Sequence, residues 1–176
     1  MFTMLKHFLP DEHVKNIFLI TPEQLKEKGI KGIITDLDNT LVEWDRPYAT
    51  PKLIEWFDEM RKNDILVTIV SNNNEQRVRA FSDPLGIPFI FQARKPMTRA
   101  FKKAINRMGL KREETVVIGD QLLTDVFGGN RGGFHTILVV PVASTDGLIT
   151  RFNRKVERRI LSFFRKRGML NWEDSK

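Results

Sequence analysis

The sequence predicts an α/β fold, in which a parallel five-stranded sheet is covered by helices on both faces. Short β-branched or aromatic runs, mostly without polar alternation, occur at 32–36, 65–70, 88–91, 115–119 and 135–140. Such runs suit strands that are buried on both faces. Helix-like stretches separate them, and strands alternating with helices at this spacing are typical of a parallel sheet.

The helix-like stretches carry their own start and stop signals. Near the N-terminus the clearest helix begins after Thr21 and stops at Gly29. A helix over 50–63 is indicated by Thr50 as its cap and by Pro51 in its first turn. Further helices are expected at 74–81, 97–108, 125–131 and 148–168, with a loop at 141–147.

The chain has 176 residues, about the size of one domain, and no repeat or linker divides it. We expect 1–176 to form a single domain with a helical lead-in at 1–31, a core at 32–140 and a C-terminal helix at 148–168. The absence of cysteine excludes disulfides, a thiolate nucleophile and a cysteine-based zinc site. The three histidines are too scattered for a metal site and are interpreted as structural or surface residues.

The formal net charge is +7, from 29 basic and 22 acidic side chains. Residues 151–167 hold eight basic residues and one acid, Glu157, so the net charge of this segment alone equals that of the whole chain. No apolar run approaches the ~20 residues needed to span a bilayer, and the N-terminus lacks a signal-peptide core. A cytoplasmic location is therefore expected.

Polar residues of a few types follow the predicted strands. The segments are DLDNT at 36–40, SNNN at 71–74, RKP at 94–96 and GDQLLTD at 119–125. In an open α/β sheet, ligands bind beyond the carboxyl ends of the strands, so we expect these segments to meet in one crevice.

The chemistry of this crevice points to a magnesium-assisted phosphate site. Several carboxylates repel one another at close range, and a hard divalent cation such as Mg²⁺ relieves that repulsion. Lys95 and Ser71 would then face phosphate oxygens, as a point charge and a hydrogen-bond donor. Because the chain has no cysteine, and no histidine near Ser71 in the sequence, the plausible nucleophile is an aspartate.

Each of these residues, taken singly, also has a plainer interpretation as a helix or turn cap. Capping requires neither a second aspartate two residues after Asp36 nor a lysine after the third strand. The combination therefore favours a reactive site, while Asn39, Thr40 and Asn73 could still serve only to shape the turns.

The four segments, in this order over about 30–140, resemble the four motifs of the haloacid dehalogenase (HAD) superfamily of phosphohydrolases. The resemblance implies a Rossmann-like, HAD-like fold with its catalytic core at 32–140. In more detail, GIKGIITDLDNTLV at 29–42, SNN at 71–73, ARKP at 93–96 and GDQLLTD at 119–125 look like the YqeG family of subclass IIIA HAD phosphatases. Relatives of that family include phosphatidylglycerophosphate phosphatases.

The resemblance also implies roles for individual residues. Asp36 would attack phosphorus and form an aspartyl-phosphate, and Asp38 would act as general acid and base. An acid at Asp38 separates phosphatases from the dehalogenases of the superfamily. The other implied contacts are Ser71, Lys95, Asn72 and Thr40 for the substrate, and Asp36, the Asp38 carbonyl, Asp120 and Asp125 for Mg²⁺.

Many members of the superfamily carry a cap domain, for which this sequence leaves no room. Only 32 residues separate Asp38 from Ser71, and 23 separate Ser71 from Lys95. A capless site favours a large or membrane-borne substrate such as phosphatidylglycerophosphate. Trp44 and Arg46, with Tyr48, are candidates for contact with its leaving group, although Trp44 could equally pack on the sheet edge.

The basic segment 151–167 forms an amphipathic helix when it is placed at 100° per residue. Its apolar side comprises Phe152, Val156, Ile160, Phe163 and Phe164, and Leu161 and Arg167 do not fit the pattern. Docking of this side on the core is favoured. Its basic side could also meet an anionic membrane at the inner face, or nucleic acid, the less favoured partner. An alternative function is a phosphatase or phospho-dependent binding module for nucleic acid or a protein partner, and oligomerisation stays open.

Overall fold

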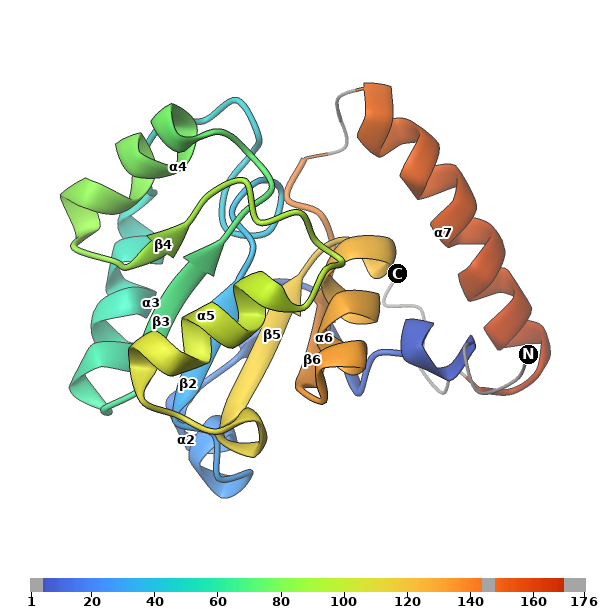
Figure 1. Cartoon of the computed structure of the whole chain (residues 1–176), viewed down its shortest axis with the longest axis horizontal. Coiled ribbons are helices and arrows are strands. Elements are labelled where there is room, and N and C mark those ends of the chain that lie inside the picture. Colours follow the sequence, from blue (N-terminus) through green and yellow to red (C-terminus); the bar gives the residue numbers. More distant parts are fainter. Residues whose placement is uncertain (1–4, 144–147, 170–176) are drawn as a thin grey trace.

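The computed structural model describes residues 5–143 and 148–169, with the backbone alone for 148–152. Its six-stranded sheet has the order β1-β6-β5-β2-β3-β4, and every pairing is parallel. The strands are β1 (Glu12–Val14), β2 (Gly32–Thr35), β3 (Leu66–Val70), β4 (Phe89–Ile90), β5 (Thr115–Gly119) and β6 (His135–Val139). The predicted α/β class with a parallel sheet is confirmed (Figure 1).

The sheet has one strand more than predicted, because β1 lies in the segment expected to be a helical lead-in. It pairs with the edge of β6, and His13 lies opposite Leu138. A three-residue strand with two polar residues carries no apolar run, so the sequence gives no strand signal there. The expected helix after Thr21 is present as α2 (Pro22–Glu27), with Thr21 as its cap.

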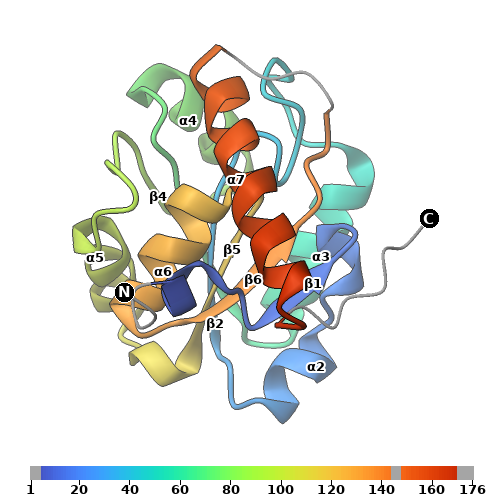
Figure 2. The same ribbon diagram turned by 90° about the vertical axis from the view of Figure 1, so that its right-hand side faces the viewer.

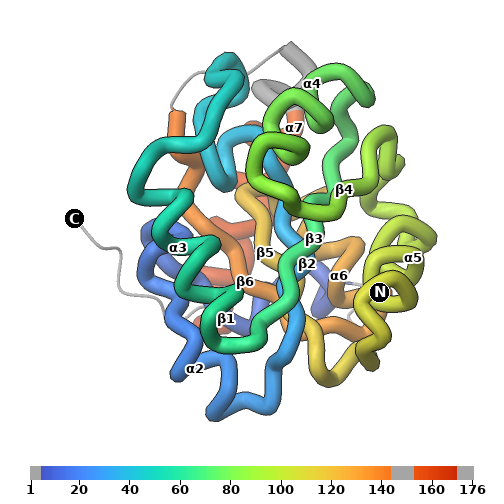
Figure 3. Tube along the Cα trace, turned by 90° about the vertical axis from the view of Figure 1, so that its left-hand side faces the viewer, coloured from blue at the N-terminus to red at the C-terminus, as the bar shows by residue number. Residues whose placement is uncertain are grey.

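Helices cover both faces of the sheet, as predicted, and Figure 3 shows α2 and α3 on one side and α5 and α6 on the other. Ile33 and Ile34 point to opposite faces, since side chains alternate along a strand. Ile33 packs in a core with α3 and α4, and Ile34 packs in a second core with α5. The helices are α3 (Pro51–Lys62), α4 (Glu75–Ser82), α5 (Arg99–Met108), α6 (Phe127–Gly132) and α7 (Leu148–Lys166).

The strand register brings three of the sequence segments side by side. Thr35 at the end of β2 lies opposite Ile69 of β3 and Ile118 of β5. The residues that follow these three strands therefore leave the sheet side by side at the carboxyl ends of the strands, with those after β2 between those after β5 and β3. This carboxyl edge of the sheet holds the candidate site.

The C-terminal helix α7 runs along the β1–β6 side of the molecule (Figure 2). Its Ile160 and Leu161 pack on a small cluster that includes Leu122 and Leu138, and its Phe164 is fully buried. The favoured docking of this helix is therefore observed, and Leu161 belongs to the packed side. Phe152 is also predicted on that side, but its side chain lies outside the described part of the structure.

The capless prediction is confirmed over two intervals that are fully described. The interval from Asp38 to Ser71 holds a loop, α3 and β3, and that from Ser71 to Lys95 holds α4, a 3-10 turn and β4. Neither contains an inserted domain. Within the described residues, no helix is both long and apolar enough to cross a membrane.

Candidate active site

Three buried aspartates meet at the carboxyl edge of the sheet. Asp36 follows β2, Asp120 follows β5, and Asp125 lies in a π-helical turn, Leu122–Val126. One carboxylate oxygen from each residue lies within 4.8 Å of the other two. Hard divalent cations take oxygen ligands of this kind.

The ammonium group of Lys95 lies between two of these carboxylates. Its Nζ is 2.8 Å from Asp36 Oδ1 and 2.6 Å from Asp125 Oδ1, and the side chain is only 2 % exposed. Burial alone would lower the pKa of Lys95, but the charges of Asp125 and Asp36 outweigh it and raise the pKa above its usual range. Lys95 therefore remains cationic, as a phosphate-binding point charge must.

The position of Asp125 depends on the glycine that ends β5. A Cβ on Gly119 would lie 2.2 Å from both Cγ and Oδ2 of Asp125. Asp125 Oδ2 also accepts the backbone N–H of Gln121 at 3.2 Å. A glycine at this position lets the carboxylate fold back onto the strand end, which gives the GDQLLTD spacing a steric reason.

Burial raises the pKa of Asp120 and of Asp125. It raises the pKa of Asp120 to about 8, with repulsion from Asp36 adding to the effect and Arg154 opposing it. It raises the pKa of Asp125 to about 6, against the attraction of Lys95. Carboxylates that are costly to ionise together would be stabilised by a divalent cation, so these residues fit such a metal.

Asp38 is held by two side chains that follow β3. Asn73 Nδ2 donates to Asp38 Oδ2 at 2.9 Å, and Arg77 Nε donates to Oδ1 at 3.1 Å. Arg77 Nη2 also lies 2.9 Å from Oδ1. Burial raises the pKa of Asp38, repulsion from Asp36 adds to this, and Asn73 and Arg77 oppose it. A carboxyl with a raised pKa is suited to donating a proton.

Ser71 and Asn72 occupy the end of β3. Ser71 is buried, and its Oγ accepts the Asn73 N–H at 3.1 Å. The Asn72 side chain accepts the Lys95 N–H at 2.7 Å and donates to the Lys95 carbonyl at 3.2 Å. Asn72 therefore anchors the backbone of Lys95, while its predicted contact with substrate stays a prediction.

The remaining predicted substrate residues lie at different depths. Thr40 is buried and donates from Oγ1 to Asp120 Oδ1 at 3.1 Å, so it orients that carboxylate. The loop between β2 and α3, which contains Trp44 and Arg46, lies at the same end of the molecule as the carboxyl ends of the strands (Figure 1). Trp44 is 47 % exposed, which disfavours packing on the sheet edge, and Arg46 pairs with Glu43 at 2.6 Å. Their contact with a leaving group stays a prediction.

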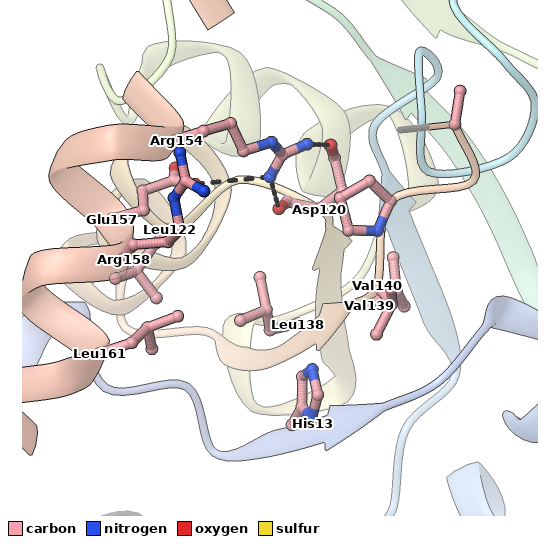
Figure 4. A pocket seen from close by; sticks show the side chains of 12 residues that line it. His13, Asp120, Leu122, Leu138, Val139, Val140, Arg154, Glu157, Arg158 and Leu161 are labelled. Atoms are coloured by element: carbon pink, nitrogen blue, oxygen red, sulfur yellow. Dashed lines mark hydrogen bonds and ion pairs between the residues drawn. The ribbon is translucent and has the colours of Figure 1, made fainter. Parts of the chain in front are cut away.

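The C-terminal helix reaches the aspartate cluster through Arg154 (Figure 4). Its guanidinium forms an ion pair with Asp120 Oδ2, and Nη1 donates to the Asp120 carbonyl at 2.6 Å. Glu157 Oε2 lies 3.4 Å from the same Nη1, and Glu157 Oε1 accepts the Leu123 N–H at 3.2 Å. The basic segment therefore contributes a cation directly to the site.

Sequence reasoning missed Arg77 and Arg154. The spacing could have indicated Arg77, because it lies in the first turn of the helix that follows Ser71, close to the strand ends. No sequence signal links Arg154 to Asp120, since helical periodicity places Arg154 on the polar side without saying what that side meets.

Comparisons with known proteins agree with this geometry. A HAD-hydrolase-like family model matches residues 92–146. The chain is 72 % identical to "Probable phosphatase YqeG" of Bacillus subtilis over 96 % of this chain and 98 % of that protein. It is 29 % identical to "Phosphatidylglycerophosphate phosphatase 1, chloroplastic/mitochondrial" of Arabidopsis thaliana, over 92 % of this chain but only 49 % of that protein.

A solved structure shares the fold. The cobalt-bound deoxy-D-mannose-octulosonate 8-phosphate phosphatase YrbI of Haemophilus influenzae superposes with a TM-score of 0.55 at 18 % identity, over 78 % of this chain and 90 % of that one. The chain therefore belongs to the YqeG family of HAD-like phosphatases.

Proposed function

We propose that this chain is a Mg²⁺-dependent phosphomonoesterase that works through an aspartyl-phosphate on Asp36. One observation carries the proposal: Asp36 touches Lys95 within a cluster of buried acids, while Asp38 is held apart by Arg77. The two aspartates of one motif are thus in different surroundings. Such a difference suits a nucleophile and a separate acid.

In the first step an Asp36 carboxylate oxygen attacks phosphorus, and the bond from phosphorus to the ester oxygen breaks. Asp38 donates its proton to that leaving oxygen, for which the raised pKa is suited. Lys95 and Ser71 hold the phosphoryl oxygens as negative charge moves onto them.

In the second step a water molecule attacks the phosphorus of the aspartyl-phosphate. Asp38, now a carboxylate, takes the water proton, and the bond from phosphorus to Asp36 breaks to release inorganic phosphate. Mg²⁺ held by Asp36, Asp120 and the Asp38 carbonyl, with Asp125 supporting its waters, would supply positive charge for the phosphoryl oxygens.

For the substrate we propose a large or membrane-borne phosphomonoester such as phosphatidylglycerophosphate. Two observations support it: the described intervals 38–71 and 71–95 contain no inserted cap domain, and the chain is similar to a protein named as a phosphatidylglycerophosphate phosphatase. An uncovered site must obtain selectivity from a wider surface than a small enclosed pocket offers.

The proposal places the protein in the cytoplasm, peripherally at the inner face of a membrane. Exposed basic residues of α7 and of the turn after it would meet the anionic surface; in the described part they are Lys155, Arg158, Arg159, Arg165, Lys166 and, in the turn, Arg167. Because α7 also supplies Arg154 to Asp120, we treat lead-in, catalytic core and C-terminal helix as one domain, 1–176.

The test compares phosphate release from three substrates with and without Mg²⁺. These are an aryl phosphate, phosphatidylglycerophosphate in anionic vesicles, and 5′-phosphorylated RNA. We expect Mg²⁺-dependent turnover of the first and faster turnover of the second. Activity on RNA without activity on the lipid would overturn the proposed substrate and leave the proposed mechanism intact. Absence of turnover on all three substrates would overturn the proposal as a whole.

A further inference from the structure

A largely apolar cleft of about 450 Å³ lies between α7 and the end of β6 (Figure 4). Its apolar walls are formed by Leu122, Leu138, Val139, Val140, Pro141 and Leu161. Asp120 and Arg154 lie at one end, and His13 lies at the other. The volume is in the range of sites that bind small molecules.

The cleft adjoins the candidate active site because Asp120 belongs to both. Its carboxylate is part of the acidic cluster with Asp36 and Asp125, and the same residue lines the end of the cleft. A phosphate held at the cluster is therefore next to an apolar space on the side of α7.

The composition of the cleft matches an amphiphile rather than a sugar or a nucleotide. Its middle offers side chains of Val and Leu, and apart from His13 its charged lining consists of two acids, Asp120 and Glu157, and two arginines, Arg154 and Arg158. Val140 is 42 % exposed, so apolar surface faces solvent on the cleft wall. Hydrocarbon in the middle and a polar headgroup at the end that carries these charges would satisfy both parts.

We propose that this cleft is the leaving-group site, and that it binds the alkyl part of an amphiphilic phosphomonoester whose phosphate lies at the aspartate cluster. The inference rests on the proposed phosphatase function and names the chemistry of its leaving group. Arg154 lies at the junction of cluster and cleft, where its guanidinium contacts the side chain and the carbonyl of Asp120.

The test uses methyl, hexyl and decyl phosphate below the concentrations at which they form micelles. A methylene group that becomes fully buried improves binding by about fourfold. Because burial in an open cleft is partial, we expect kcat/KM to rise on the order of 100-fold from methyl to decyl phosphate. Decylphosphonate, which cannot be hydrolysed, should bind more tightly than methylphosphonate in calorimetry, which gives a readout without turnover.

Two matched variants locate the alkyl chain. Val140→Asn places an amide on the cleft wall and should lower the decyl-to-methyl ratio of kcat/KM about tenfold. Val142→Asn is the control, because Val142 is 47 % exposed, lies two residues further on and does not line the cleft. It should leave the ratio unchanged.

The outcomes separate this inference from the proposed function. Turnover of methyl phosphate with no dependence on chain length would overturn the leaving-group site and leave the phosphatase intact. If Val140→Asn and Val142→Asn change the decyl-to-methyl ratio of kcat/KM equally, the alkyl chain binds elsewhere, and the leaving-group site is again overturned. Absence of turnover on every phosphate, with decylphosphonate still bound in a Val140-dependent way, would overturn the phosphatase and keep the cleft as an amphiphile site.

Discussion

The candidate site is built from two regions that differ in how they are held. The strand-end region consists of Asp36, Lys95, Asp120 and Asp125, whose buried side chains lie close together beyond the carboxyl ends of the strands, with Lys95 paired to Asp36 and Asp125. The second region is α7, which packs on the molecule through Ile160, Leu161 and Phe164, and exposes most of its basic residues. Arg154 joins the two regions through Asp120.

The difference suggests a division of labour. Charges at strand ends are fixed by the register of a sheet buried on both faces, and reacting groups need such fixed geometry. A peripheral helix with one apolar and one basic side can instead meet a surface, while Arg154, which points inward in the described part of the helix, reaches Asp120. The predictions below test whether chemistry resides in the first region and substrate access in the second.

The largest effect is expected for Asp36→Asn. An amide cannot form the aspartyl-phosphate, so aryl-phosphatase activity should fall at least about 10³-fold, as for other nucleophile deletions. The circular dichroism spectrum should be unchanged. Asp45→Asn is the matched control, because Asp45 is an exposed aspartate of the nearby loop. Activity of Asp36→Asn near the wild-type rate would contradict the assignment.

A smaller loss is expected for Arg77→Gln, because Arg77 acts through Asp38. Burial raises the pKa of Asp38 and Arg77 opposes this, so its removal should raise that pKa further. We expect kcat to fall about 10- to 100-fold, and the limb of the pH–rate profile that reports Asp38 to move to higher pH. Arg77→Lys should have a smaller loss of kcat and a smaller shift of the pH–rate profile than Arg77→Gln, because it keeps a positive charge near Asp38.

Arg79→Gln serves as the control for that variant. Arg79 lies on the same helix, but it pairs with Glu75 at 2.6 Å on the exposed side. A drop in kcat without a shift of the pH profile would indicate that Arg77 has only a structural role.

Most of the strand-end region was predictable, because local residue types there reflect local demands. Gly119 must lack a side chain where Asp125 folds back, and Asp36 must follow a buried strand. The contacts of Arg77 and Arg154 were not predictable to the same degree. They depend on where a helix packs, and helical periodicity gives the sides of α7 without its position on the core.

The edge strand β1 illustrates the same limit. Its residues are half-buried and partly polar, and Glu12 pairs with His135 and Lys28 across the chain. Its extended conformation is set by pairing with β6, which is distant in sequence. Tertiary context of this kind overrides local propensity.

A moderate effect on stability is expected when pH is varied without metal. Asp120 and Asp125 keep their protons in the folded state up to about pH 8 and about pH 6, whereas unfolded aspartates lose theirs near pH 4. The folded state therefore binds more protons in this window, so stability should fall as pH rises from 5 to 8. The slope is at most about 1.4 kcal/mol per pH unit for each proton.

Thermal melting with a chelator at pH 5 and pH 8 measures this slope. Mg²⁺ binds the ionised carboxylates, so the increase in Tm that it causes should be larger at pH 8. Asp120→Asn removes one titrating group and should flatten the dependence. If the Tm measured with chelator instead rises from pH 5 to pH 8, the burial of these acids is not the dominant cause of the pH dependence.

The smallest effect on aryl-phosphatase activity is expected from the exposed side of α7. Replacing Lys155, Arg159 and Lys166 by glutamine removes three charges that point to solvent. Each basic residue near an anionic membrane contributes about 1 kcal/mol, so vesicle association should weaken on the order of 100-fold at low salt. Aryl-phosphatase kcat/KM should stay within about twofold of wild type.

The control removes the same three charges from other exposed surfaces, at Lys62, Lys102 and Lys103. If both triple variants lose vesicle association equally, the attraction follows net charge and α7 is not a membrane-facing element. If the α7 variant alone loses it and keeps its aryl-phosphatase activity, access and chemistry reside in separate regions. A large loss of activity in that variant would instead mean that the helix controls the strand-end region through more than Arg154.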